Sequence, residues 1–266
     1  MAANTWRRRA RRALREAPVS AESELMSGEA WRAFCRDLEK AGDIVLQAHA
    51  AASPLDRAEG FRYLTRLLRV ALEMNLEWSD SDFPGFYQAS HQTAKIGADN
   101  PDNHYLNATM SGSRRYRIRG RRGTAPILTF GSKANRYAID GTMASTGELA
   151  VEDMAIAPDR SFEVIVSKEK PGGEVNWLPM ADDTSLIVVR QTFHDRANET
   201  VSELKIEALD GPARPNPLTP AALVSGLAGS VGFVGGTART FLRWAEQFRE
   251  QQKNRLATLD QTMFQR

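Results

Sequence analysis

The sequence is poor in cysteine and lacks the motifs of common metal and cofactor sites. Its single cysteine, Cys35, cannot form an internal disulfide, which favours a reducing compartment such as the cytoplasm. No C-x-x-C or H-E-x-x-H spacing occurs and the four histidines are scattered, so we predict no metal site. The Walker, dinucleotide-binding and G-x-S-x-G patterns are absent as well. This disfavours familiar nucleotide enzymes and serine hydrolases and predicts no bound cofactor.

A strongly hydrophobic run is also missing. Residues 215–238 carry no charge, but five glycines, two serines and two threonines make them only weakly hydrophobic. For this segment we predict a helix buried against a sheet or lining an apolar pocket, in preference to a membrane span. The arginine-rich start of the chain is followed by no apolar segment, so no signal peptide is predicted.

The positive charge is concentrated at the N-terminus. Residues 1–16 hold six arginines and one glutamate, a net charge of +5, which leaves −3 for residues 17–266 of a chain whose net charge is +2. We interpret this segment as a solvated arm. Peripheral contact of residues 1–16 with an acidic membrane stays open as an alternative, whereas nucleic-acid binding is disfavoured.

The 266 residues, of which 42% are apolar, can form one large domain or two small ones. The periodicity of apolar residues changes twice along the chain and predicts an α+β fold. We expect a basic tail at 1–26, a helical region at 27–98, an antiparallel β domain resembling a sandwich at 99–210 and a helical region at 211–266.

Two helices are expected before the strands. The first spans Gly28 to Ala50, with Ser27 as N-cap and Cys35 on its buried face. The second begins at Ser53, where a serine N-cap, a proline at the next position and Asp56 form a capping-box pattern. Its expected apolar stripe consists of Phe61, Leu64, Leu68, Ala71 and Leu72.

Alternation of apolar and polar residues predicts several short strands after Tyr105. Residues 116–120 and 127–130, joined by the basic turn 120–123, are interpreted as a hairpin. Further strands are expected at 162–167, 186–193 and 204–209. The last helix should begin with Thr219 as its cap, and the small residues on one of its faces predict that another element packs close to its backbone or that the helix is broken.

The segment from Asp99 to Gly123 is the best candidate for a polar site. Residues 100–103 have the composition of a turn. Directly after it come His104 and Tyr105, candidates for acid/base chemistry, with Asp102 as the group that orients the imidazole and Asn103 as a substrate-binding amide. Adjacent residues of a strand face opposite sides, so we expect only one of His104 and Tyr105 to face a given pocket.

Three arginines are candidates for anion stabilisation. Arg117 and Arg119 share one side of a predicted strand, and Arg190 lies on the strand 186–193 among apolar neighbours. For Arg190 a buried ion pair and an anion clamp stay open. Asn176 and Trp177 are expected in a loop before that strand, as a pocket wall or as a plug over one end of a sandwich.

Several short motifs resemble proteins that carry a DUF1214 domain, a family found mainly in bacteria. The matching segments are 58–64 (AEGFRYL), 99–102 (DNPD), 116–123 (YRIRGRRG), 176–178 (NWL) and 189–191 (VRQ). The resemblance implies a β-sandwich-like domain with helical additions and specifies no chemistry. Similar proteins usually continue past the position of Arg266 into a strand-rich segment. We therefore expect a natural short form, a truncated gene product or a fragment, which a partner chain or a second copy completes.

Two functions from different classes are consistent with these features. The leading one is a cofactor-independent lyase or hydrolase that acts on a lipophilic, aromatic or steroid-like small molecule, with His104, Tyr105, Asp102 and Arg190 as its catalytic residues. The alternative is a binding or scaffolding β-sandwich module without chemistry. The first interpretation expects the turn, the arginine-rich strand and Arg190 to meet at an apolar hollow between sheet and helix.

Overall fold

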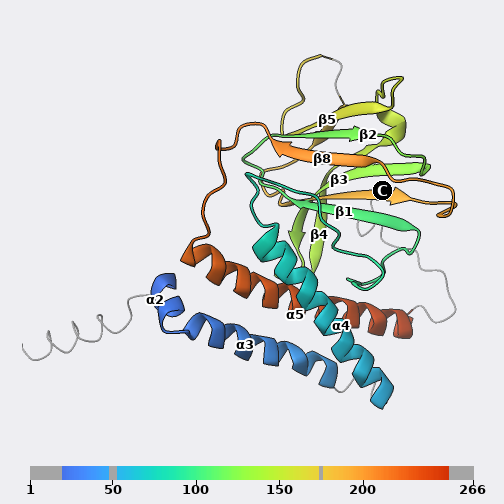
Figure 1. Ribbon diagram of the computed structural model, residues 1–266. Coiled ribbons are helices and arrows are strands. Elements are labelled where there is room, and N and C mark those ends of the chain that lie inside the picture. The colour runs from blue at the N-terminus through green and yellow to red at the C-terminus, as the bar shows by residue number, and fades with distance from the viewer. Residues whose placement is uncertain (1–19, 48–52, 174–175, 252–266) are drawn as a thin grey trace, which may run out of the picture.

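The computed structural model describes residues 20–47, 53–173 and 176–251. A β-sandwich of two four-stranded sheets lies on a layer of helices, and the two helical regions of the sequence join in that one layer (Figure 1). The fold is α+β, with a central β region that is antiparallel except for one pair of strands, so the predicted fold class is confirmed.

The first sheet has the strand order β1-β7-β3-β4, and the second has the order β6-β5-β2-β8. The strands of the first sheet pair antiparallel, whereas β5 and β6 of the second sheet pair in parallel. The strands are β1 Asn103–Thr109, β2 Tyr116–Arg121, β3 Ile127–Arg136, β4 Thr142–Ala150, β5 Ser161–Ser167, β6 Asn176–Pro179, β7 Leu186–Thr192 and β8 Glu203–Ala208. A short 3-10 helix, η3, spans Val151–Asp153.

The predicted hairpin of residues 116–130 is wrong. β2 pairs with β5 and β8 in the second sheet, and β3 pairs with β4 and β7 in the first. Both strands alternate apolar side chains, and placing them on facing sheets buries Ile118 and Phe130 in one core. The connection crosses the sandwich edge, where Gly123 donates its N–H to the Ser202 hydroxyl at 3.0 Å.

The other predicted strands are found within one or two residues of their expected bounds at β5, β7 and β8. Strand β4 was not predicted, because its sequence TMASTGELA contains small and polar residues and little alternation. Residues 176–179 were expected in a loop and instead form β6, which is a correction.

The first predicted helix is divided in the structure. Helix α2 Ala21–Met26 lies before the predicted range, in the segment expected to be part of the tail, whereas α3 Glu29–Gly42 and the 3-10 helix η1 Asp43–Leu46 fall within it. Gly28 separates the first two with a φ of 73°, so Gly28, and not Ser27, is the N-cap of α3. The predicted extension toward Ala50 enters residues 48–52, which lie outside the described part of the chain.

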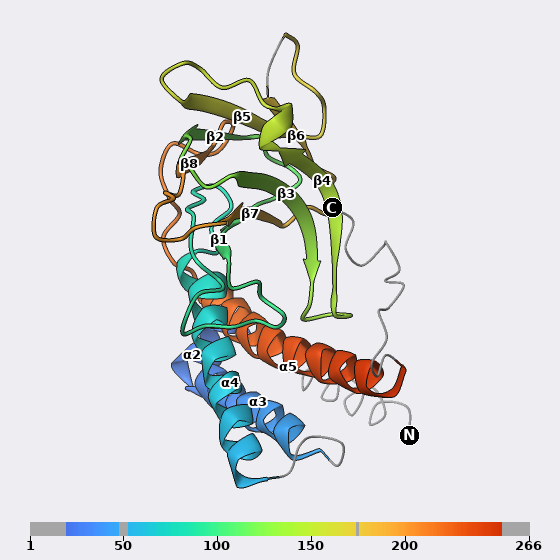
Figure 2. The same cartoon turned by 90° about the vertical axis from the view of Figure 1, so that its right-hand side faces the viewer.

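Cys35 was expected in the core and is exposed, so this prediction is wrong. The buried residues of α3 are Ala30, Phe34 and Ala41, while Trp31 keeps 62% of its surface exposed. Helix α3 lies at the outside of the helical layer (Figure 2) and packs on α5 through a narrow face. Apolar residues at the margins of that face therefore remain in solvent.

Helix α4, Pro54–Leu72, confirms the predicted start. The Ser53 side chain accepts the N–H of Asp56, and the Asp56 carboxylate accepts the N–H of Ser53. The buried face consists of Leu64, Leu67, Val70 and Ala71, whereas Phe61 of the expected stripe is 44% exposed. A π-helical turn, η2 Glu73–Glu77, continues the helix.

Helix α5, Pro220–Gln251, is continuous and passes beneath the first sheet (Figure 2). The Thr219 hydroxyl accepts the N–H of Ala222 at 3.1 Å, which confirms the predicted cap. A Cβ added at Gly236 would overlap the carbonyl oxygen of Tyr137, and one at Gly226 would overlap Leu76. The glycines therefore permit close packing, the first of the two alternatives predicted for this face.

Among the described residues, α5 is the one helix long and apolar enough to cross a membrane, by length and composition alone. Half of its most apolar window, 50%, is buried inside the protein. Val234 and Phe233 belong to the core that α5 shares with α3 and α4. This arrangement agrees with the predicted buried helix.

Candidate functional site

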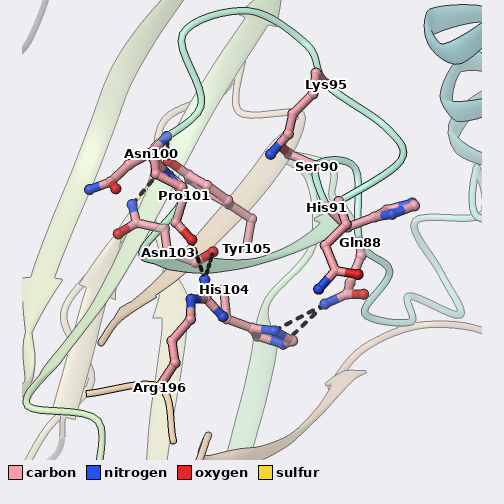
Figure 3. A pocket seen from close by; sticks show the side chains of 11 residues that line it. Gln88, Ser90, His91, Lys95, Asn100, Pro101, Asn103, His104, Tyr105 and Arg196 are labelled. Carbon is pink, nitrogen blue, oxygen red and sulfur yellow. Dashed lines mark hydrogen bonds between the residues drawn. The ribbon is translucent and has the colours of Figure 1, made fainter. Parts of the chain in front are cut away.

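A polar cleft with a volume of about 400 Å³ lies beside the start of β1 (Figure 3). It is bounded by β1, by the loop of residues 88–101 and by Arg196, which follows β7. Its lining residues are Gln88, Ser90, His91, Gln92, Lys95, Asn100, Pro101, Asn103, His104, Tyr105 and Arg196.

Two backbone hydrogen bonds place the loop over the edge of the first sheet. The N–H of Tyr87 donates to the Asn107 carbonyl at 2.9 Å, and the N–H of Asn107 donates to the Tyr87 carbonyl at 2.8 Å. On its other side β1 pairs with β7. The cleft therefore wraps around a strand at the edge of its sheet, and an edge strand exposes polar backbone as well as side chains.

The charge of the lining is one-sided. It contains Lys95, Arg196 and two histidines, but no aspartate or glutamate. The Lys95 amine makes no ion pair with any residue that the structure describes. Arg196 donates to the carbonyls of Pro101 and Asn103 and lies over the Phe193 ring, 4.7 Å from its centroid. One cation is thus held in place by the fold and the other is available to meet a ligand.

His104 is half-buried and faces Gln88. The Gln88 amide nitrogen lies 3.0 Å from Nδ1 of the imidazole and 3.4 Å from its Nε2. Burial lowers the pKa of His104, and the positive charge of Arg196 lowers it further. If the amide donates to Nδ1, the single proton of the neutral ring is on Nε2, and this nitrogen is then a hydrogen-bond donor.

Tyr105 is held by two donors. Its hydroxyl oxygen accepts the N–H of Asn100 at 3.2 Å and the side-chain amide of Asn103 at 3.0 Å (Figure 3). The phenolic proton itself is donated to no residue in the described part of the chain. Both His104 and Tyr105 line the cleft, contrary to the expectation that only one would. At an edge strand a cleft can extend around the backbone and reach both faces.

The predicted turn of residues 100–103 is present. The Asn100 side chain accepts the N–H of Asp102 at 2.9 Å, and the Asn100 carbonyl accepts the N–H of Asn103 at 3.1 Å. Asp102 is exposed, does not line the cleft, and contributes its carbonyl to a bond with the N–H of Phe193. The structure therefore does not bring its carboxylate to His104.

Arg190 lies directly opposite Tyr105 in the register of β1 and β7. It is half-buried, on the face of the first sheet that is turned away from the sandwich core. Burial raises the pKa of Tyr137, and the positive charge of Arg190 opposes that rise. Arg190 makes no ion pair with a described residue and does not line the cleft. Of the four predicted catalytic residues, the structure brings together His104 and Tyr105.

Arg117 and Arg119 lie on β2 of the second sheet, away from the cleft. Arg117 pairs with Glu207 at 2.6 Å and Arg119 with Glu163 at 3.3 Å, in a ladder across β5, β2 and β8. Exposed pairs of this kind contribute about 0.2–1 kcal/mol each. The expected meeting of these arginines with the turn and Arg190 at one hollow is not found.

Asn176 and Trp177 also lie outside the cleft. The Asn176 side chain donates to the carbonyls of Ala155 and Glu163, both at 2.9 Å, and accepts the N–H of Ala155. The Trp177 indole donates to Ser167 at 3.1 Å. Their polar groups join neighbouring segments of the sandwich.

Sequence reasoning missed Gln88, Ser90, His91, Gln92, Lys95 and Arg196. Residues 88–95 (QASHQTAK) are mostly polar and show no helical or strand periodicity. Their polarity was the only sequence feature that could have indicated a site. Nothing local indicates that this segment folds back over β1, because its contacts lie about 20 residues away in the sequence.

Among the described residues, no group of three or more histidine, cysteine or acidic side chains is arranged to hold a metal.

A second cleft, of about 430 Å³, lies where α5 meets the connection between β3 and β4. Its lining combines Arg239 and Arg243 with Asp140 and Glu246. Asp140 already pairs with Arg136 at 3.0 Å. With charges of both signs, this cleft has no clear ligand preference.

No family model matches the sequence, and no curated protein matches it either. The chain resembles the crystal structure of an uncharacterised protein from Burkholderia cenocepacia, with 47% sequence identity and a TM-score of 0.83 over 87% of this chain and 64% of that one. It thus spans slightly less than two thirds of that protein's length. The VPA0106 protein from Vibrio parahaemolyticus shares 14% identity, with a TM-score of 0.34 over 66% of this chain and 51% of that one.

Proposed function

We propose that this protein binds a small anionic molecule in the cleft beside β1. The observation that carries the proposal is the combination of Lys95 and Arg196 with no acidic side chain in the lining. Cations without acidic partners in a concave site attract carboxylates and phosphates, and hydrogen bonds to charged groups are the stronger ones. The volume of about 400 Å³ is within the range of small-molecule sites.

Neutral donors add to the cations. The hydroxyl of Tyr105 can donate its proton to a ligand oxygen without a change in the bond that it accepts from Asn103. Both ring nitrogens of His104 face the Gln88 amide, so the imidazole donates to a ligand when it turns away from that amide. Because the Tyr105 hydroxyl is positioned before the ligand enters, it requires little ordering on binding. The cleft is therefore best suited to a ligand with negatively charged oxygens.

A lipophilic substrate, the leading prediction from the sequence, has less support. Pro101 and the ring of Tyr105 are the main apolar surfaces of the lining, and the other side chains are polar or charged. Desolvating those groups against an apolar ligand would cost free energy without hydrogen bonds in return. We therefore favour a polar anion.

Proton donation by Tyr105 is a second candidate function. Two hydrogen bonds reach its oxygen, while its own proton has no acceptor among the described residues. Such a phenol can protonate a negative charge that develops on a substrate oxygen, and the adjacent cations would stabilise that charge beforehand. This would make the protein a cofactor-independent enzyme, with Tyr105 as the acid.

The test measures anion affinity by calorimetry in the full-length protein, with inorganic phosphate and acetate as first probes. Lys95→Met and Arg196→Met should each weaken binding about tenfold, because each removes one charged contact. Arg214→Met is the matched control, since Arg214 is exposed and lies outside the cleft. Absence of binding by either probe, or equal affinities in all four proteins, would reject the proposal.

We also propose a family relationship, a cellular location and an assembly for this protein. The motifs of the sequence support a relationship to DUF1214-domain proteins, and the single cysteine supports a cytoplasmic location. We also propose assembly with a second copy or a partner chain, motivated by the edge strand β4, which pairs on one side only. The basic segment 1–16, a proposed membrane contact, lies outside the described residues.

A further inference from the structure

The lining of the cleft beside β1 contains several side-chain amides. Gln88, Gln92, Asn100 and Asn103 are four of its lining residues. An amide offers both a donor and an acceptor, whereas a simple anion uses donors alone. The lining is therefore richer in hydrogen-bond acceptors than an anion by itself requires.

Several of these groups are unused in the protein. Asn103 is occupied, since its oxygen accepts the Thr192 hydroxyl at 2.8 Å and its nitrogen donates to Tyr105. The Gln92 amide, the side-chain oxygen of Gln88 and the side-chain nitrogen of Asn100 have no hydrogen-bond partner among the described residues. Both kinds of group, donor and acceptor, thus remain available to a ligand.

Ser90 provides a second, independent observation. It is 7% exposed, and its hydroxyl oxygen is buried without a hydrogen-bond partner in the described part of the chain while the residue lines the cleft. A buried hydroxyl without a partner loses hydration that nothing replaces. Because this oxygen is closed off from solvent, a ligand hydroxyl removes that cost when the Ser90 side chain rotates toward the cleft.

The charge of the site decides which ligand donors fit. Amide oxygens beside a bound anion would repel it unless the ligand also presents O–H or N–H groups to them. An ammonium group would be repelled by Lys95 and Arg196, which leaves neutral donors, and hydroxyls are the neutral groups that both donate and accept. We infer that the ligand is a polyhydroxylated anion, a sugar acid or a sugar phosphate. This inference rests on the proposed anion-binding function.

The experiment compares ligands that differ in hydroxyl groups and share the same kind of anionic group. Calorimetry on the full-length protein uses glucuronate against hexanoate, which each have six carbons and one carboxylate, and glucose 6-phosphate against inorganic phosphate. We expect the hydroxylated member of at least one pair to bind about tenfold tighter or more, since several hydrogen bonds are added. Which pair shows the preference identifies the anion as carboxylate or phosphate.

The outcomes separate the two proposals. If both members of each pair bind with equal affinity, the hydroxyl inference is overturned and anion binding stands. If neutral glucose binds as tightly as the charged sugars, anion binding is overturned. If none of these ligands binds, both proposals fail.

Two variants test the residues that carry the inference. Gln92→Met and Ser90→Ala should each weaken binding of the hydroxylated ligand several-fold more than binding of hexanoate or phosphate. Gln47→Met, a glutamine outside this cleft, is the matched control and should keep the wild-type preference. Thermal unfolding of each variant verifies folding. A preference retained in both cleft variants would contradict the assignment.

Discussion

At the scale of single residues, His104 and Tyr105 show how strand position determines chemistry. They are adjacent on β1, yet Gln88 contacts one and Asn103 the other. Burial and the charge of Arg196 lower the pKa of His104, and the Tyr105 hydroxyl donates to no residue in the described part of the chain. If both residues donate toward the cleft, they favour the negative charge of the proposed ligand.

The depressed pKa of His104 predicts a pH dependence of stability. Below the ordinary imidazole pKa of 6.5 the unfolded chain binds a proton more readily than the folded one, so stability should fall as the pH drops from 6.5 to the lower folded pKa. Urea unfolding of wild type and His104→Gln between pH 5 and 8 measures the difference. The variant should lose this component, whereas His194→Gln, at an exposed histidine, should follow wild type.

A bound anion should raise the pKa of His104, because negative charge favours the imidazolium ion. The imidazole signals of wild-type protein, followed by NMR with and without the anion, report this shift directly. An unchanged His104 titration in saturating anion would show that the ligand does not reach the ring.

At the scale of elements, the glycines of α5 fix how closely it approaches its neighbours. Gly236 lies against the carbonyl of Tyr137, and Gly226 lies against Leu76 of the π-helical turn. A glycine in a helix interior costs about 0.8–1 kcal/mol relative to alanine. At these positions that cost is offset by packing that a side chain would prevent.

Two substitutions in α5 test this interpretation. Gly236→Ala should lower the free energy of unfolding by about 1–3 kcal/mol, because its Cβ would overlap backbone. At Gly232 the added Cβ would lie 3.5 Å from Ala138, an ordinary contact, so Gly232→Ala should be neutral or stabilise by about 0.4–1 kcal/mol. Chemical denaturation measures both. Equal effects would show that close approach is not the reason for Gly236.

At the scale of the whole molecule, there are two large apolar cores and a smaller cluster that joins Val70 of α4 to Tyr87, Ala89 and Ala94. One core fills the sandwich and the other lies between α3, α4 and α5. The Tyr63 hydroxyl donates to the carbonyl of Ile96, and Gly97 lies against the Phe241 ring. The loop that lines the cleft is therefore anchored on the helical layer, and both cores support the geometry of the site.

The burial of α5 predicts that the folded protein does not bind a membrane through this helix. In a sucrose-gradient flotation experiment, the protein should not float together with vesicles of zwitterionic lipid. The reason is that the apolar face of α5 is already in contact with α3 and α4. Flotation with these vesicles would contradict the packed position of the helix. Acidic vesicles, tested with the full chain and a variant lacking residues 1–16, measure the separate contribution of the basic segment.

The sequence by itself determined the features that depend on neighbouring residues. The caps at Ser53 and Thr219, the strand 186–192 and the turn of residues 100–103 all rest on hydrogen bonds or periodicity within a few positions. Local chemistry is sufficient for such features, because the interacting groups are adjacent in the chain. His104 and Tyr105 were chosen as candidates for the same reason, since they follow the turn directly.

Only the tertiary structure decided how these elements face one another. Whether β2 and β3 form a hairpin or lie in opposite sheets depends on partners as distant as Glu203 and Leu186, and the exposure of Cys35 depends on which face of α3 meets α5. The cleft joins residues 88–105 with Arg196, about 90 positions later. Periodicity carries no information on such contacts, because it records which face is apolar and not which surface covers it.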